Sequence, residues 1–210
     1  MAEPWKELVT LPPQELKKIP YNDPRLDAFA RAVEVRYDLP PGLIEAVKNA
    51  GERTQTTQVS PKGAKGVMQF IDSTREIYPH DYNNPLASID ASGRYFKDLI
   101  KRYNGNVKAA VSAYNGGTAA GKAVLKGQEA PADETRKYWA RMQDYMRKKA
   151  QQEQKASPAP VTQPEESLMD KVKRVAPPVV GGKGELVSDV FGSKQKEDTP
   201  DEGMIPDMKK

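Results

Sequence analysis

Apolar side chains recur at helical spacing through residues 24–150, and this periodicity constrains the fold more than any other feature of the chain. Asp23 can cap a first helix and Pro24 can begin it. The apolar face of that helix would consist of Leu26, Phe29, Ala30, Val33 and Tyr37. No segment alternates apolar and polar residues with the period of a strand. The pattern therefore predicts an all-α, mainly α-helical fold without a β-sheet.

Prolines and glycines divide the rest of this region into further helices. Residues 39–42 break the first helix and restart a second one, which Gly51 ends or loosens. After a polar stretch, the apolar spacing predicts helices over residues 67–77, 89–103, 107–114, 118–125 and 133–150.

The composition divides the chain into three parts. Residues 1–23 hold four prolines and one tryptophan and are expected to form an N-terminal extension with a possible docking segment. Residues 24–150 form the predicted domain. Residues 151–210 are rich in Gln, Lys, Pro, Ser, Glu and Gly, so they bury too little apolar surface to offset the entropy of ordering. We expect a flexible tail in which residues 168–175 and 186–191 can form docking helices on a partner.

Charge and residue usage exclude several functional classes. A net charge of +4 favours contact with acidic polymers, but the basic residues alternate with acids, so no specific nucleic-acid binding is expected. The chain has no cysteine and one histidine, His80, in a polar, turn-like stretch, which argues against a metal site. No apolar run approaches the ~20 residues of a membrane span, and residues 1–6 lack a signal-peptide pattern, so another delivery route is expected.

Two short segments carry the residues best suited to chemistry. The loop 59–70 contains small or flexible residues, which are expected where a backbone passes close to a neighbouring group. It ends near the amide of Gln69. About 45 residues later, Tyr114 and Asn115 precede two glycines, and an isolated acid, Glu52, lies upstream of both segments. One acid facing amide and hydroxyl groups across glycine-lined backbone indicates a sugar-cleaving site.

Four segments together resemble the lytic transglycosylases of the SLT type, whose fold is similar to goose-type lysozyme. Their order and intervals are like those of the family, and the resemblance covers about residues 24–146. The segments are Pro40–Ile44, Ser60–Gln69, Ala113–Gly117 and Glu134–Tyr138.

The resemblance implies cleavage of the β-1,4 bond between N-acetylmuramic acid and N-acetylglucosamine in peptidoglycan, with a 1,6-anhydro sugar at the product end. One carboxyl group would act as acid and then as base, so neither a metal nor a cofactor is needed. Glu52 is the candidate, and Tyr114 would orient it by a hydrogen bond. The resemblance places further residues against substrate: Ser60, Met68, Gln69, Tyr114, Asn115 and Tyr138.

The position of the acid departs from the family pattern. The resemblance expects a glutamate nine residues before Ser60, where this chain has Gly51, and a slip of one residue on an ideal helix rotates a side chain by ~100°. Either Gly51 ends the helix early or permits a local bulge that re-aims Glu52, or the acid is lost and the domain only binds glycan. We favour the first account, because the other groove residues are present. Glu45, two turns before Glu52, is expected to be a surface or salt-bridged residue.

The absent signal pattern, the lack of cysteine and the docking segments in the tail favour a phage virion component that opens the host wall during entry. It would act in the host periplasm or cell wall, with a virion protein as the partner of its tail. A bacterial enzyme exported by a dedicated secretion machine is the alternative setting. The alternative activities are a lysozyme-type hydrolase and a catalytically impaired peptidoglycan-binding structural virion protein.

Overall fold

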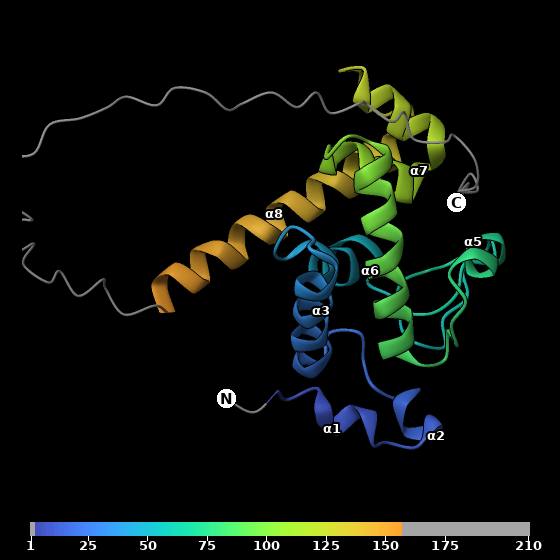
Figure 1. The fold of residues 1–210 in the computed structure, drawn as a ribbon, viewed down its shortest axis with the longest axis vertical. Helices are drawn as coiled ribbons and strands as arrows, with labels where there is room; N and C mark the ends of the chain where they lie inside the picture. Colours follow the sequence, from blue (N-terminus) through green and yellow to red (C-terminus); the bar gives the residue numbers. More distant parts are fainter. Residues whose placement is uncertain (1–2, 157–210) are drawn as a thin grey trace, which may run out of the picture.

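The computed structural model describes residues 3–156, and within them the chain is mainly α-helical and forms no strand, which confirms the predicted fold class. None of the helices in this range is long and apolar enough to cross a bilayer. Figure 1 shows their arrangement. In chain order the elements are α1 (Lys6–Val9), α2 (Pro13–Leu16), α3 (Pro24–Tyr37), α4 (Leu43–Ala46), the π-helix η1 (Val47–Glu52), α5 (Asp72–Ile77), α6 (Pro85–Arg102), α7 (Val107–Leu125) and α8 (Asp133–Ala156).

Helices α3 and α6 pack along each other and form the centre of the domain. Helix α3 begins as predicted, because the carboxylate of Asp23 accepts a hydrogen bond from the backbone N–H of Arg25 at 2.8 Å. The two helices approach closely at Gly93, where a Cβ would lie 2.4 Å from Cγ1 of Val33. Helix α4 packs against both of them, α7 packs against α6, and η1 packs against α4 and α8.

Several predicted helix boundaries differ from the structure, and α6 already begins at Pro85 rather than at residue 89. Helix α5 begins at Asp72 rather than Val67, because Lys65 and Phe70 exchange backbone hydrogen bonds of 3.0 and 3.1 Å and Gln69 has a positive φ of 47°. These contacts hold residues 65–70 as a tight loop. The helices predicted at 107–114 and 118–125 form one element, α7, kinked at Gly117. Helix α8 continues six residues beyond 150 to Ala156.

The described part of the N-terminal extension packs against the domain. Leu8, Leu16 and Ile19 are buried in the same hydrophobic core as the later helices, and the ring of Trp5 meets that of Phe29 edge-on at 5.1 Å. The segment therefore contributes apolar surface to the domain, while its role in docking stays a prediction. The two predicted docking helices of the tail, 168–175 and 186–191, lie outside the described residues.

Helix α4 and η1 together form the segment that carries Glu52. The buried carboxylate of Glu34 in α3 caps the start of α4 by accepting hydrogen bonds from the backbone N–H groups of Gly42, Ile44 and Glu45 at 2.7, 2.8 and 3.1 Å. The segment then widens into η1, where the N–H of Arg53 donates to the carbonyl of Lys48, five residues earlier, at 3.0 Å. Such a turn accommodates one more residue than an α-helical turn and changes the direction of every side chain after it.

Candidate active site

A cleft of about 1000 Å³ lies where η1, the loop 60–69, the kinked part of α7 and the start of α8 meet. Five of the predicted site residues line it: Glu52, Ser60, Gln69, Asn115 and Tyr138. These five residues, which lie up to 86 positions apart in the sequence, therefore come together at the end of η1.

The carboxylate of Glu52, half-buried at the end of η1, accepts a hydrogen bond from the hydroxyl of Tyr138 at 2.9 Å. Burial, and the nearby charge of Glu52, raise the pKa of Tyr138 well above its ordinary value. The same two causes raise the pKa of Tyr114. Both phenols therefore keep their protons at neutral pH, and the Tyr138 phenol remains a hydrogen-bond donor to this carboxylate.

The widened turn accounts for the glycine at the position where the family pattern expects the acid. The first of our two accounts had Gly51 either end the helix early or permit a local bulge, and η1 is such a bulge. Gly51 also permits a close approach, because a Cβ there would lie 2.4 Å from both Cζ and the hydroxyl oxygen of Tyr138. The tyrosine can reach Glu52 because residue 51 has no side chain.

The loop 60–69 is shaped by its own polar groups. The hydroxyl oxygen of Ser60 accepts from the backbone N–H of Ala64 at 3.0 Å, and the side-chain amide of Gln69 donates to the carbonyl of Gly66 at 2.8 Å. Gly66 has a positive φ of 76°, and a Cβ there would lie 2.8 Å from the carbonyl oxygen of Tyr82. Ser60 and Gln69 thus face the cleft from a loop that they help to hold closed.

Asn115 faces the cleft from α7, just before the kink at Gly117. Its side chain is almost fully buried, yet it forms part of the cleft wall. A buried amide on a cleft wall has donors and an acceptor to offer to a ligand. Asn115 is therefore the best placed of these residues to bind an amide or hydroxyl of a sugar.

Met68 and Tyr114 lie behind the cleft rather than on its wall. Both side chains are fully buried, the hydroxyl of Tyr114 donates to the carbonyl of Met68, and the ring of Tyr114 stacks on Phe96 with centroids 4.7 Å apart. We expected Tyr114 to orient the acid by a hydrogen bond, and in the structure Tyr138 donates such a bond to Glu52. Tyr114 and Met68 support the cleft from the core.

Arg141, which was not among the predicted site residues, also lines the cleft. Its guanidinium donates to the carbonyl of Ala50 at 3.2 Å and to the carboxylate of Glu134 at 3.2 Å, and it lies over the ring of Tyr138. Its position three residues after Tyr138, on the same face of a helix, could have indicated it. Glu45, expected at the surface or in a salt bridge, is buried and paired with Arg31 at 2.6 Å.

A metal-binding cluster is not present among residues 3–156. The ring nitrogen Nδ1 of His80 lies 2.7 Å from the carbonyl oxygen of Tyr78, and the ring meets Phe70 edge-on. His80 therefore has a structural environment between α5 and α6.

A helical domain with one tyrosine-held carboxyl group at the end of a helix, in an open cleft, defines a lysozyme-like class of protein. The family model of the transglycosylase SLT domain matches residues 29–137, which is just over half of the chain. The chain belongs to the transglycosylase SLT domain family. Membership indicates an enzyme of the lytic transglycosylase type with peptidoglycan as its substrate. Tyr138 and Arg141 lie just beyond the matched residues.

Proposed function

We propose that this protein is a peptidoglycan lytic transglycosylase with Glu52 as its single acid and base. It would cleave the β-1,4 bond between N-acetylmuramic acid and N-acetylglucosamine and leave 1,6-anhydromuramoyl ends. The observation that carries the proposal is the hydrogen bond from Tyr138 to Glu52 at the cleft. The other acid on the cleft wall, Glu134, is exposed and bound to Arg141.

The chemistry needs two proton transfers through one carboxyl group. Protonated Glu52 first gives its proton to the glycosidic oxygen as the bond to C1 of the muramic acid breaks. The resulting carboxylate then takes the proton of the sugar's own 6-hydroxyl, whose oxygen bonds to C1 and closes the anhydro ring. No water is consumed, and Glu52 ends protonated as it began. The hydroxyl of Tyr138 stabilises the intermediate carboxylate by donating to it.

The remaining cleft residues would hold the glycan while this occurs. The amide of Asn115 suits the N-acetyl or hydroxyl groups of a sugar. The hydroxyl of Ser60 accepts from Ala64 and so can donate its own proton to a ligand. Gln69, which also lines the cleft, uses its amide nitrogen within the loop, so its side-chain oxygen would be the acceptor that it offers to a sugar.

Product analysis tests the proposal against its alternatives. Purified protein is incubated with peptidoglycan sacculi, and the soluble fragments are measured by mass spectrometry. A transglycosylase releases anhydro fragments, whereas a lysozyme-type hydrolase releases reducing ends that are heavier by one water. A structural binding protein would sediment with the sacculi and release nothing. Either of the latter results contradicts the proposal.

We further propose that the enzyme opens the host wall locally during phage entry, as a component of the virion acting in the host periplasm or cell wall. The composition of residues 151–210, with two apolar segments in a polar background, supports attachment to a larger assembly. Mass spectrometry of purified virions would detect the protein if this is correct. Detection only in an exported bacterial fraction would support the alternative setting.

A further inference from the structure

One row of polar side chains on helix α8 contacts the segment that carries Glu52, from Glu45 in α4 to Glu52 at the end of η1. The row consists of residues spaced by three, four and four positions, which places them on one face of the helix. We call these residues the α8 polar row: Tyr138, Arg141, Tyr145 and Lys149. All four lie beyond the residues that match the family model.

The members of the α8 polar row bond to successive turns of α4 and η1. Near the cleft, Tyr138 donates to Glu52 and Arg141 donates to the carbonyl of Ala50. Further along, the hydroxyl of Tyr145 donates to the carboxylate of Glu45 at 2.7 Å and accepts from the side-chain amide of Asn49 at 2.8 Å. Lys149 ends the row with an ion pair of 3.0 Å to Glu45.

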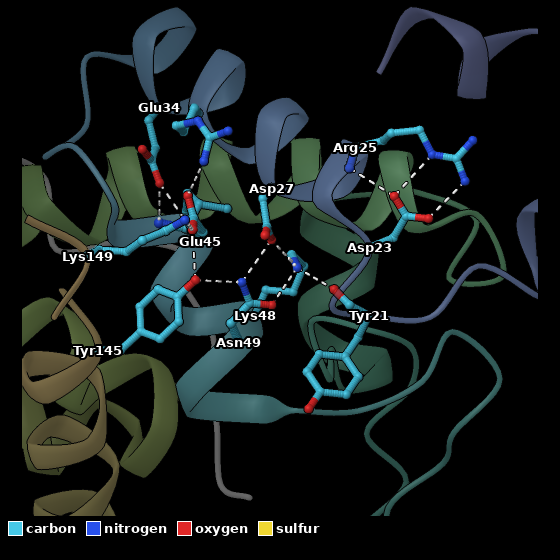
Figure 2. A network of polar contacts seen from close by, with 12 residues as sticks. Tyr21, Asp23, Arg25, Asp27, Glu34, Glu45, Lys48, Asn49, Tyr145 and Lys149 are labelled. Atoms are coloured by element: carbon cyan, nitrogen blue, oxygen red, sulfur yellow. Dashed lines mark hydrogen bonds and ion pairs between the residues drawn. The ribbon is translucent and has the colours of Figure 1, made fainter. Parts of the chain in front are cut away.

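A second group of contacts ties the same turn to α3, and Figure 2 shows it meeting Tyr145 of the α8 polar row at Asn49. The fully buried ammonium group of Lys48 lies 2.7 Å from the carboxylate of Asp27 and also donates to Asn49 and to the carbonyl of Tyr21. The amide of Asn49 donates to Asp27 at 2.8 Å as well as to Tyr145. Asn49 therefore links α3 to α8 through the first half of the widened turn.

Stability alone is a weak reason for such a network. Removing a buried charge from water costs several kcal/mol, and apolar residues of similar volume are often at least as stabilising. Directional bonds, however, fix where each residue of a helix lies. Here they act on Lys48 and Asn49, and the carbonyl of Lys48 accepts the five-residue hydrogen bond that defines the widened turn.

We infer that Tyr145 and Asn49 are positioning residues for Glu52. Their hydrogen bond holds the widened turn in the register that brings Glu52 to Tyr138, although neither residue lines the cleft. The inference rests on the proposed function only in naming Glu52 as the reacting group. In structural terms, the link between α3 and α8 through Asn49 maintains the hydrogen bond from the N–H of Arg53 to the carbonyl of Lys48.

Tyr145→Phe tests this directly, because it removes the hydroxyl and keeps the ring. We expect kcat on soluble peptidoglycan strands to fall about tenfold with KM nearly unchanged, as the loss of one hydrogen bond that acts through geometry predicts. Hydrogen exchange of the Arg53 amide, followed by NMR, should accelerate about tenfold. Asn49→Ala removes the other end of the same bond together with its bonds to Asp27 and Lys48, so the double variant should lose little more than Asn49→Ala alone.

Tyr37→Phe is the matched control. Tyr37 is also a half-buried tyrosine whose hydroxyl donates to a carboxylate, that of Asp90 at 3.1 Å, between α3 and α6 and away from the cleft. It should lower thermal stability to a similar extent and leave both kcat and the Arg53 exchange rate unchanged. Unchanged exchange at Arg53 in Tyr145→Phe and Asn49→Ala would overturn the inference. A wild type that releases no anhydro sugar would instead refute the proposed function, while the exchange measurement still decides the inference.

Discussion

A side chain at residue 51 would occupy the same space as the ring of Tyr138. The absence of a side chain at Gly51 therefore allows Tyr138 to hold the carboxylate of Glu52. A Cβ at residue 51 would approach the ring to 2.4 Å, much closer than van der Waals contact. We therefore expect Gly51→Ala to displace Tyr138 and to lower kcat by about 10- to 100-fold, the effect of losing a hydrogen bond to a charged group. Steady-state kinetics on soluble peptidoglycan strands measure the change.

The control for this substitution is Gly105→Ala. Gly105 has a φ of 81° and open space around it, so an added Cβ costs about 1 kcal/mol of backbone strain without a clash. We expect this variant to lose stability and keep its activity. Full activity in Gly51→Ala would show that the approach of Tyr138 to residue 51 is unimportant.

The resemblance to the SLT family predicted much of the cleft but not the depth of each side chain. Ser60, Gln69, Asn115 and Tyr138 line it with Glu52, as expected. Met68 and Tyr114 were assigned to the same groove but are buried behind it, because a spacing pattern does not distinguish a wall residue from the core residue that supports it. Arg141 was not predicted: its spacing from Tyr138 places it on the same helix face, but this spacing does not show its contact with a carbonyl of η1.

At the scale of elements, the capping signal at Asp23 predicted the start of α3, whereas the cap of α6 was not predicted. Asn84 caps α6 by accepting from the backbone N–H groups of Leu86 and Ala87 at 3.0 and 3.2 Å. We expect Asn84→Ala to lower the free energy of unfolding by about 1 kcal/mol and to leave activity unchanged, because this end of α6 lies outside the cleft. Urea denaturation checks the value. The neighbouring Asn83→Ala, which removes no cap, should stay within about 0.5 kcal/mol of the wild type.

The elements that sequence could not predict depend on contacts between distant residues. Residues 67–71 have the apolar content of a helix, yet the pairing of Phe70 with Lys65 holds them as a loop. The sequence predicted no π-helix as such, only that Gly51 ends the helix early or permits a local bulge, as one of two accounts of the glycine at the expected acid position. Its actual range, Val47–Glu52, is set by bonds to α3 and α8 that arise only in the folded domain.

At the scale of the whole molecule, His80 should make stability depend on pH. Burial, followed by the charges of Arg75 and Arg94, lowers the pKa of His80 below its ordinary 6.5, against the opposing effects of the Tyr78 carbonyl and Asp81. The folded state therefore binds the proton less readily than the unfolded chain. This contribution to stability is present above pH ~6.5 and is lost as the pH falls through the lowered pKa, by at most about 1.4 kcal/mol per pH unit.

Urea denaturation of the wild type and of His80→Gln between pH 7.5 and 5 measures this contribution. The variant lacks the titrating ring, so its free energy of unfolding should fall less steeply with decreasing pH than that of the wild type. Other groups titrate equally in both proteins, and their effects cancel in the difference. Parallel curves would mean that the His80 environment does not disfavour its protonated form.

The central claim is that Glu52, re-aimed by the widened turn, is the only acid that performs the chemistry. The release of anhydro fragments by Glu52→Gln, compared with that by Glu134→Gln, tests it most directly, since both acids line the same cleft. We expect Glu52→Gln to sediment with sacculi but to lose activity by at least about 100-fold. Glu134→Gln, which removes only an exposed ion pair with Arg141, should retain activity within about threefold. An active Glu52→Gln, or a loss confined to Glu134→Gln, would contradict the claim.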